Sequence, residues 1–158
     1  MRNRTYLISL VTLTIMMISV NSCKKDEGFT QVTEFERNIQ NAMNDYRATR
    51  GKPALTQTFL MIDDAQSYSA KMANESVGFN TDGVLADLEL LRVNVGADSS
   101  GVWVAYCEYE NPDSVMNIIK SNPKIVSLVM GEFNLSAIGT AKDVNGNFYI
   151  TNLLLRKR

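Results

Sequence analysis

Cys107 and Ser121 are the candidate nucleophiles of this sequence, and no histidine can activate them, because the 158 residues include no histidine. This excludes Ser-His-Asp and Cys-His catalysis, a histidine-containing zinc site and a histidine pH switch. Cys107 lies in an apolar run, which favours a buried, inert thiol over a catalytic one. Ser121 and Lys124 remain as a Ser-Lys arrangement, which requires a buried lysine with a lowered pKa.

Carboxylates offer a second kind of chemistry, general acid–base catalysis, at Asp63-Asp64 and at Glu108 with Glu110. Adjacent acids on a helix point about 100° apart, so Asp63 and Asp64 do not face one another. Glu108 and Glu110 share one face of a strand but have no identified partner. We interpret both pairs as solvated surface.

The segment from Asp143 to Asn147 resembles the opening of a calcium-binding loop. Phe148 stands where that loop needs a glycine, and Leu154 stands where it needs a bidentate glutamate. Asn145-Gly146 between two apolar runs is instead a strong hairpin signal. We therefore predict a hairpin turn here, and we expect neither a metal site nor a cofactor.

Residues 1–22 are typical of a signal peptide, with two arginines before an uncharged apolar run from Tyr6 to Val20. That run is shorter than a typical membrane-spanning helix. The sequence Val20-Asn-Ser-Cys23 resembles the lipobox of bacterial lipoproteins, which implies diacylation of Cys23 and a stable membrane anchor. The alternative is an ordinary signal peptide followed by an incidental cysteine.

Residues 23–31 are a polar tether that leads into one domain, residues 32–158. Lys24-Lys25-Asp26-Glu27 resembles the surface-export signal of Bacteroidetes-type lipoproteins, and a solvated linker is the other interpretation. Lipidation of Cys23 leaves Cys107 without a disulfide partner, so the domain depends on its hydrophobic core. The net charge of −1 and the isoelectric point near 5.5 argue against a nucleic-acid partner.

The hydrophobic patterns predict helices that flank a small, mainly antiparallel sheet, which is an α+β sandwich. Thr33 and Glu36 are spaced as a capping box for the first helix, whose apolar stripe begins at Phe35. The second helix is expected to place Leu60 inside, and residues 96–101 are expected to be a loop. The predicted elements are helices at 33–47, 57–74 and 84–91, a strand at 102–107, helices from Pro112 and at 125–130, and a hairpin at 134–155.

Several short motifs, in order along the chain, resemble those of the CAP domains, also called SCP-like or cysteine-rich secretory protein domains. The resemblance covers about residues 33–157 and implies a three-layer α-β-α sandwich. The motifs are Asn44-Asp-Tyr-Arg47 with Gly51 and Pro53-Ala-Leu55, then residues 65–73, Ser121-Asn-Pro-Lys124, Ile138-Gly139 and Tyr149-Ile-Thr-Asn152.

The departures from that family concern its cleft, where complete members place two histidines and two acids. The resemblance puts Asn80 at the place of the first histidine and Lys124 at the place of the second. Trp103 falls where a cleft glutamate would stand, and Glu108 follows shortly after it. Because an amide and an ammonium cannot replace two imidazoles, we do not expect the family's metal site. Asn80, Trp103, Glu108, Ser121 and Lys124 form the candidate cleft.

Two functions follow as hypotheses. The first is a non-enzymatic binding or interaction domain, held at the cell envelope by the lipid on Cys23 and engaging an apolar small molecule, an envelope polymer or a protein. The expected location is the outer membrane, with exposure at the cell surface. The second is a hydrolase that uses Ser121 and Lys124 in the degenerate cleft.

Overall fold

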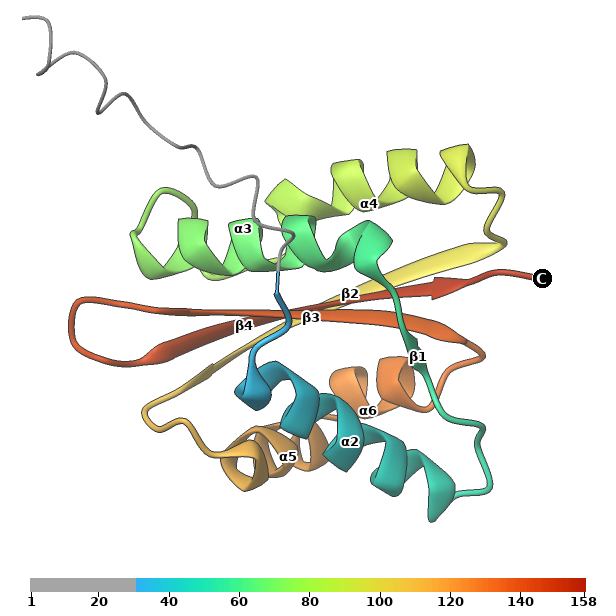
Figure 1. Cartoon of the computed structure of the whole chain (residues 1–158), viewed down its shortest axis with the longest axis horizontal. Helices are drawn as coiled ribbons and strands as arrows, with labels where there is room; N and C mark the ends of the chain where they lie inside the picture. The colour runs from blue at the N-terminus through green and yellow to red at the C-terminus, as the bar shows by residue number, and fades with distance from the viewer. Residues whose placement is uncertain (1–30) are drawn as a thin grey trace, which may run out of the picture.

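In a computed structural model of the chain, residues 31–158 form three layers, with a four-stranded sheet between two groups of helices (Figure 1). The structure describes residues 31–158, so the predicted signal peptide, the lipidation of Cys23 and nearly all of the tether lie outside it. Within residues 31–158, no helix combines the length and the apolar character needed to cross a membrane. The three-layer α+β sandwich predicted from the sequence is confirmed.

The strands form a mixed sheet in the order β1-β3-β4-β2, in which only β1 runs parallel to its neighbour. The strands are β1 (Thr56–Gln57), β2 (Ser99–Cys107), β3 (Leu135–Lys142) and β4 (Phe148–Arg156). The helices are α2 (Glu34–Ala48), α3 (Ile62–Ala73), α4 (Asp82–Asn94), α5 (Pro112–Ser121) and α6 (Pro123–Val129), with a 3-10 turn η1 (Phe59–Met61) before α3.

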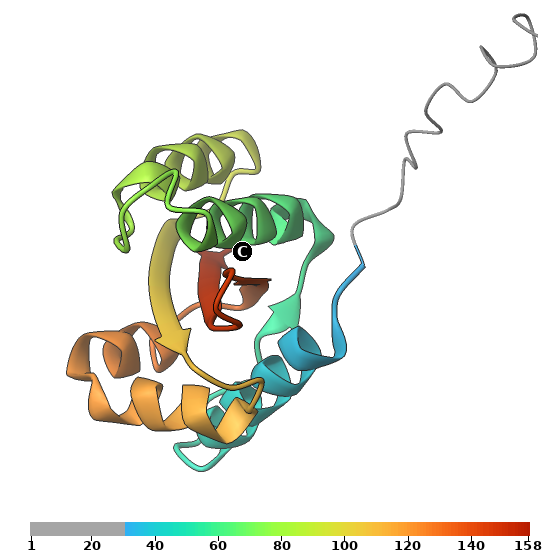
Figure 2. The ribbon, with the colours of Figure 1, turned by 90° about the vertical axis from the view of Figure 1, so that its left-hand side faces the viewer.

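The two faces of the sheet carry separate hydrophobic cores, because side chains alternate along each strand. Trp103, Ala105 and Ile150 pack on the side of α2, α5 and α6. Val102 and Leu153 pack on the other side, against α3 and α4. Figure 2 shows α3 and α4 on one side of the sheet and the other three helices on the opposite side.

Two helix starts follow from local sequence, as predicted. The Thr33 hydroxyl accepts a hydrogen bond from the backbone N–H of Glu36 (3.1 Å), and the Glu36 carboxylate accepts one from the backbone N–H of Thr33 (2.8 Å). This capping box begins α2. The Asn111 side chain caps α5 by accepting a hydrogen bond from the backbone N–H of Asp113 (2.9 Å), and Pro112 occupies the first turn of that helix.

The predicted start of the second helix is wrong by five residues. Thr56 and Gln57 pair with Leu135 and Ser136 as β1, and α3 begins only at Ile62. Leu60, expected inside, is exposed in η1. Such pairing depends on β3, which lies far along the chain, so the helical period around residue 60 could not reveal it.

The region before β2 also differs from the prediction. Helix α4 spans Asp82–Asn94, longer than the expected 84–91. Residues 99–101, expected in a loop, belong to β2 because they pair with residues 154–156 of β4. Pairing with β4 therefore extends β2 beyond residues 102–107, whose β-branched and aromatic side chains favour a strand.

The predicted hairpin turn between β3 and β4 is confirmed. The Asp143 carboxylate accepts hydrogen bonds from the backbone of Asn145 (2.8 Å) and from the backbone (2.9 Å) and amide (3.0 Å) of Asn147. These bonds, that of the Asn147 amide foremost, lower the pKa of Asp143. Gly146 has a φ of +90°, a conformation that favours glycine.

Candidate functional site

The structure does not bring the five residues of the candidate cleft together. Asn80 is exposed in the α3–α4 loop, where its backbone carbonyl accepts a hydrogen bond from the Tyr68 hydroxyl (3.1 Å). Tyr68 belongs to the core on the α3 and α4 side. Trp103 lies in the core on the opposite side of the sheet. Glu108, just after β2, is exposed.

Trp103 is a core residue, with 2% of its surface exposed. Its side chain packs in the cluster that also contains Met43 of α2 and Ile119 of α5. A residue this buried cannot line a cleft that is open to solvent. The indole therefore fills the interior at the place where the family resemblance had suggested a cleft carboxylate.

Ser121 and Lys124 lie at the junction of α5 and α6, and both are exposed. The backbone N–H of Lys124 donates to the Asn122 side chain (3.1 Å), which caps α6. Within residues 31–158, no hydrogen bond joins the Ser121 hydroxyl to the Lys124 ammonium. A Ser-Lys dyad needs a buried lysine, and this junction does not bury one.

Cys107 is buried at the end of β2, and its thiol donates to the Tyr109 carbonyl (3.2 Å). Burial raises the pKa of Cys107, so less of the nucleophilic thiolate forms at neutral pH. We expect a disulfide reagent to modify Cys107 in the folded chain at least about tenfold more slowly than after denaturation. Absorbance of the released thiolate measures both rates, and equal rates would contradict the assignment.

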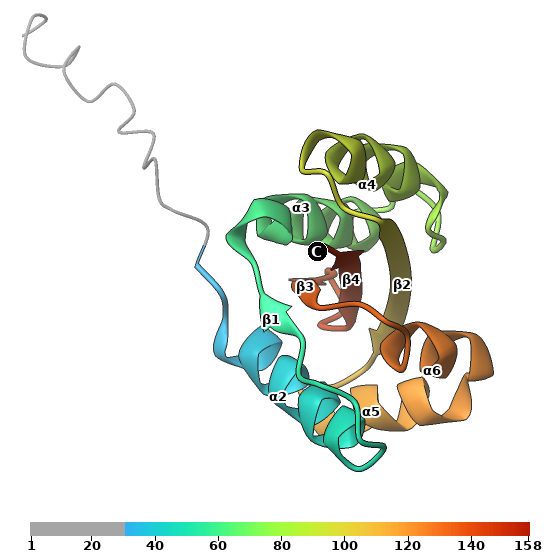
Figure 3. The ribbon, with the colours of Figure 1, turned by 90° about the vertical axis from the view of Figure 1, so that its right-hand side faces the viewer.

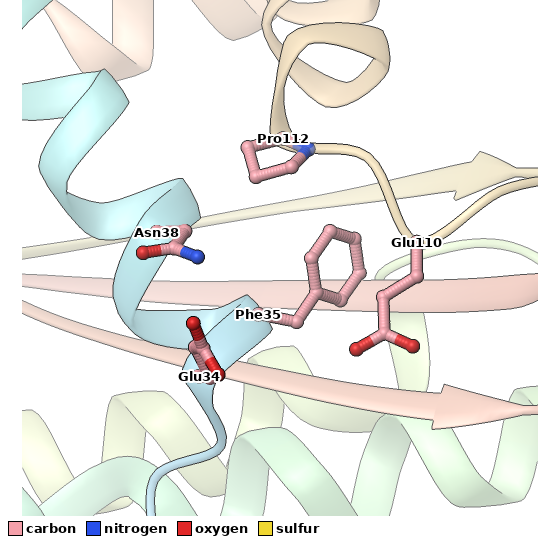
Figure 4. A pocket seen from close by; sticks show the side chains of 5 residues that line it. All are labelled: Glu34, Phe35, Asn38, Glu110 and Pro112. Carbon is pink, nitrogen blue, oxygen red and sulfur yellow. The ribbon is translucent and has the colours of Figure 1, made fainter.

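A surface pocket of about 310 Å³ lies where the first turns of α2 face the loop that leads into α5. Figure 4 shows its five lining residues: Glu34, Phe35 and Asn38 from α2, Glu110 from the loop, and Pro112 from the first turn of α5. Glu34 and Asn38 share one side of α2 because they are four residues apart. The packing of α2 against α5 brings Glu110 to them.

The pocket combines an apolar residue, Phe35, with the negative charges of Glu34 and Glu110. Phe35 is buried and its ring packs edge-on against Phe148, with centroids 5.1 Å apart. Figure 4 shows Glu34 and Glu110 on either side of Phe35. Both carboxylates are exposed, and neither takes part in an ion pair within residues 31–158. Such a site suits a cation carried on a short carbon chain.

A divalent metal is a poorer match for this pocket. Only two of its five lining residues are acids, and the part of the chain that the structure describes contains no cluster of three or more metal-ligating side chains. A hard cation such as calcium takes six to eight oxygen ligands. An ammonium group needs only a few acceptors, which the carboxylates of Glu34 and Glu110 supply.

Of the five residues that line this site, sequence reasoning considered only Glu110 for chemistry, and it interpreted Glu110 as solvated surface. It noted Glu110 as an exposed acid beside Glu108, but it did not connect it to Glu34 or Asn38. No spacing signal links these residues, since α2 and the β2–α5 loop are far apart in the sequence and meet only by packing. Glu108 itself does not line the pocket.

The three layers around a mixed sheet give the chain the fold of the CAP, or SCP-like, domains, as its likeness to solved structures shows. No family model and no curated protein matches the sequence. The backbone of this chain is similar to those of three solved structures.

An outer surface protein from Borrelia burgdorferi has a TM-score of 0.64 at 11% identity, covering 81% of this chain and 96% of that one. A cysteine-rich secretory protein from Staphylococcus aureus has a TM-score of 0.59 at 15% identity, covering 78% of this chain and 38% of that one. A venom allergen-like protein from Schistosoma mansoni has a TM-score of 0.56 at 13% identity, covering 80% and 92%. The fold predicted from the sequence motifs is thereby confirmed.

Proposed function

We propose that this chain is a lipid-anchored CAP-like domain of the cell envelope that binds, without catalysis, an amine-bearing group in the pocket between α2 and α5. The observation that carries the proposal is the presence of two exposed carboxylates, Glu34 and Glu110, on either side of Phe35 in the lining of one pocket. The ligand is a small molecule, an envelope polymer or a protein with a protonated amine. The net negative charge of the chain argues against nucleic acid as the partner.

The envelope location is supported by the sequence before the domain. A basic start, an apolar run and a lipobox-like Cys23 follow one another in the order that export and lipidation require. The structurally similar Borrelia protein is itself an outer surface protein. Two or three acyl chains on Cys23 would anchor the domain stably at the outer membrane.

The non-enzymatic part of the proposal is supported by what the site residues lack. The chain has no histidine, Trp103 is buried in the core, and Ser121 and Lys124 are both exposed. The hydrolase alternative would need Lys124 to be buried beside Ser121. An apolar small molecule also fits this pocket less well than an amine, because two carboxylates border it.

Titration with 1,5-diaminopentane tests the pocket. We expect the Asn38 side-chain amide signals to shift in ¹H–¹⁵N NMR spectra, because this amide lies beside the bound ammonium. Glu34→Gln and Glu110→Gln should each weaken binding about two- to fivefold, the usual effect of one exposed ion pair. Both substitutions keep the side-chain shape at exposed positions, so the fold should be unchanged.

Glu108→Gln is the matched control, since it removes an exposed charge two residues from Glu110 but outside the pocket. It should leave the affinity nearly unchanged. 1-Pentanol, which lacks the charge, should produce no shift at Asn38. Equal binding by the Glu34→Gln, Glu110→Gln double variant and by the unmodified chain would show that the amine does not bind here.

A further inference from the structure

Exposed apolar side chains gather on one layer of this domain. Among the described residues, nine large hydrophobic side chains are exposed, and six of them come from η1, α4 and the loop before α4. These six are Phe59, Leu60, Phe79, Leu85, Leu90 and Val93. The other three lie on β2, in the loop after it and at the hairpin tip, and none lies on α2, α5 or α6.

Helix α4 carries large apolar side chains on its exposed side as well as on its buried side, among exposed acids such as Asp87 and Glu89. Val84 and Leu88 pack into the core, while Leu85, Leu90 and Val93 are 51%, 63% and 61% exposed on the outside. A helix at a protein surface ordinarily presents charged and polar side chains outward. The outer side of α4 is therefore suited to an apolar neighbour.

The chain enters the domain beside α3, at the border between this layer and the start of α2. The Gln31 carbonyl accepts a hydrogen bond from the Gln66 side chain of α3 (3.2 Å), and Val32 packs against the core on the α3 and α4 side. Figure 3 shows the coloured part of the chain starting beside α3. Residues 24–31 span roughly 26 Å when fully extended. A lipid on Cys23 would thus hold the α3–α4 layer within reach of the bilayer.

We infer that the α3–α4 layer rests on the membrane surface, with Leu85, Leu90 and Val93 of α4 among the lipid headgroups. The inference rests on the proposed anchor at Cys23 and adds an orientation to it. Apolar side chains that are spread separately over a layer suit a fluid lipid surface, which adapts to them, better than a rigid partner. Tethering makes even weak contacts effective, because it raises their local concentration.

This orientation turns the proposed ligand pocket away from the membrane. Glu34 and Glu110 belong to the layer of α2 and α5, on the opposite side of the sheet from α4 (Figure 1). An anchored domain in this position presents its pocket to the surrounding solvent. The apolar side chains of α4 and the pocket therefore lie on the two outer layers of one sandwich.

The charge of the α3–α4 layer specifies the kind of lipid. Residues 59–94 contain six acidic and two basic residues, and one of the two, Arg92, is paired with Glu89. Asp64 lies near Asp63 and Asp87, so negative charges gather beside α4. Repulsion between these acids and anionic headgroups favours a zwitterionic surface such as phosphatidylcholine.

The orientation can be measured with a single reporter side chain. A chain that starts at Cys23 contains every described element, and its Cys23 thiol can be coupled to a maleimide lipid while Cys107 stays buried. In phosphatidylcholine vesicles with brominated acyl chains, we expect the fluorescence that Leu90→Trp adds to that of the buried Trp103 to fall about twofold relative to unbrominated vesicles. The matched variant Asn117→Trp, exposed on α5, should show no more quenching than the unmodified chain.

Several outcomes would overturn the inference. Equal quenching of Leu90→Trp and Asn117→Trp would mean that no layer faces the bilayer. Concentration-dependent self-association of the uncoupled chain that Leu90→Asp abolishes would mean that a second copy covers α4. Stronger quenching after phosphatidylglycerol is added at low salt would contradict the charge argument. Because the coupling is chemical, these results are independent of lipidation in cells, which mass spectrometry of Cys23 tests separately.

Discussion

Gly139→Ala is expected to be among the most destabilising substitutions in this domain. A Cβ at residue 139 of β3 would stand 2.1 Å from the backbone of both Ala65 and Gln66 in α3. Backbone atoms of a packed helix cannot turn aside as a flexible side chain can, so α3 would have to move off the sheet. We expect a loss of about 3 kcal/mol or more in the free energy of unfolding, at the upper end for overpacking.

Urea denaturation followed by circular dichroism measures this loss, and Gly101→Ala provides the comparison. A Cβ at Gly101 of β2 meets only side-chain atoms of Phe133 and Leu128, the nearest at 2.9 Å. Those side chains can shift, so this substitution should cost less than Gly139→Ala. If both variants lost the same stability, the close contact of α3 with β3 would not be the cause.

Arg47→Ala should produce a comparable loss, for a different physical reason. The Arg47 side chain is 1% exposed and donates hydrogen bonds to four backbone carbonyls, those of Pro53 (2.8 Å), Val129, Gly131 (3.1 Å) and Phe133 (3.2 Å). Burial lowers the pKa of Arg47, and nearby Glu132 acts in the opposite direction. Truncation would leave these carbonyls without their donor, which we expect to cost about 3–5 kcal/mol.

Two companion variants separate the hydrogen bonds of Arg47 from its charge. Arg47→Lys keeps the positive charge but loses the planar fork of donors, so we expect it to recover only part of the stability. Arg50→Ala removes an exposed cation one turn away, which lies over the Tyr46 ring at 5.6 Å, and should cost less than about 1 kcal/mol. Thermal unfolding compares the three, and full recovery by lysine would show that charge alone matters.

These contacts explain the motif around Arg47 without reference to catalysis. Asn44 holds the segment after α2, since its side chain accepts a hydrogen bond from the backbone N–H of Leu55 (2.8 Å) and donates one to its carbonyl (3.0 Å). Gly51 has a φ of +66°, which allows the chain to turn back between them. The motif therefore joins α2 to the start of the sheet, and it predicts fold better than function.

The sequence predicted those parts of the fold that depend on neighbouring residues. The capping box at Thr33, the proline start of α5 and the hairpin at Asn145-Gly146 each depend on contacts within a few residues, and each is confirmed. The two-residue strand β1 was missed because its only partner is β3, far along the chain. Loop-closing pairings of this kind leave no periodic signal.

For the candidate site too, some conclusions follow from the sequence and others depend on contacts between distant residues. The absence of histidine excludes whole classes of chemistry, and that conclusion needs no coordinates. The order of apolar run, cysteine and polar tether likewise predicts an anchored domain from the sequence alone. The places of Trp103 and Glu110 were decided only by the tertiary structure, which buries the first and sets the second opposite Glu34.

The physical reason is the range of the interactions involved. Backbone conformation at a cap or a tight turn is determined by a few adjacent side chains, so sequence spacing is enough to predict it. Which strand face a residue occupies, and what lies across from it, depends on register and on the packing of distant helices. By itself the sequence determined the excluded chemistry and the local elements, while only the tertiary structure placed the pocket on one outer layer and the apolar side of α4 on the other.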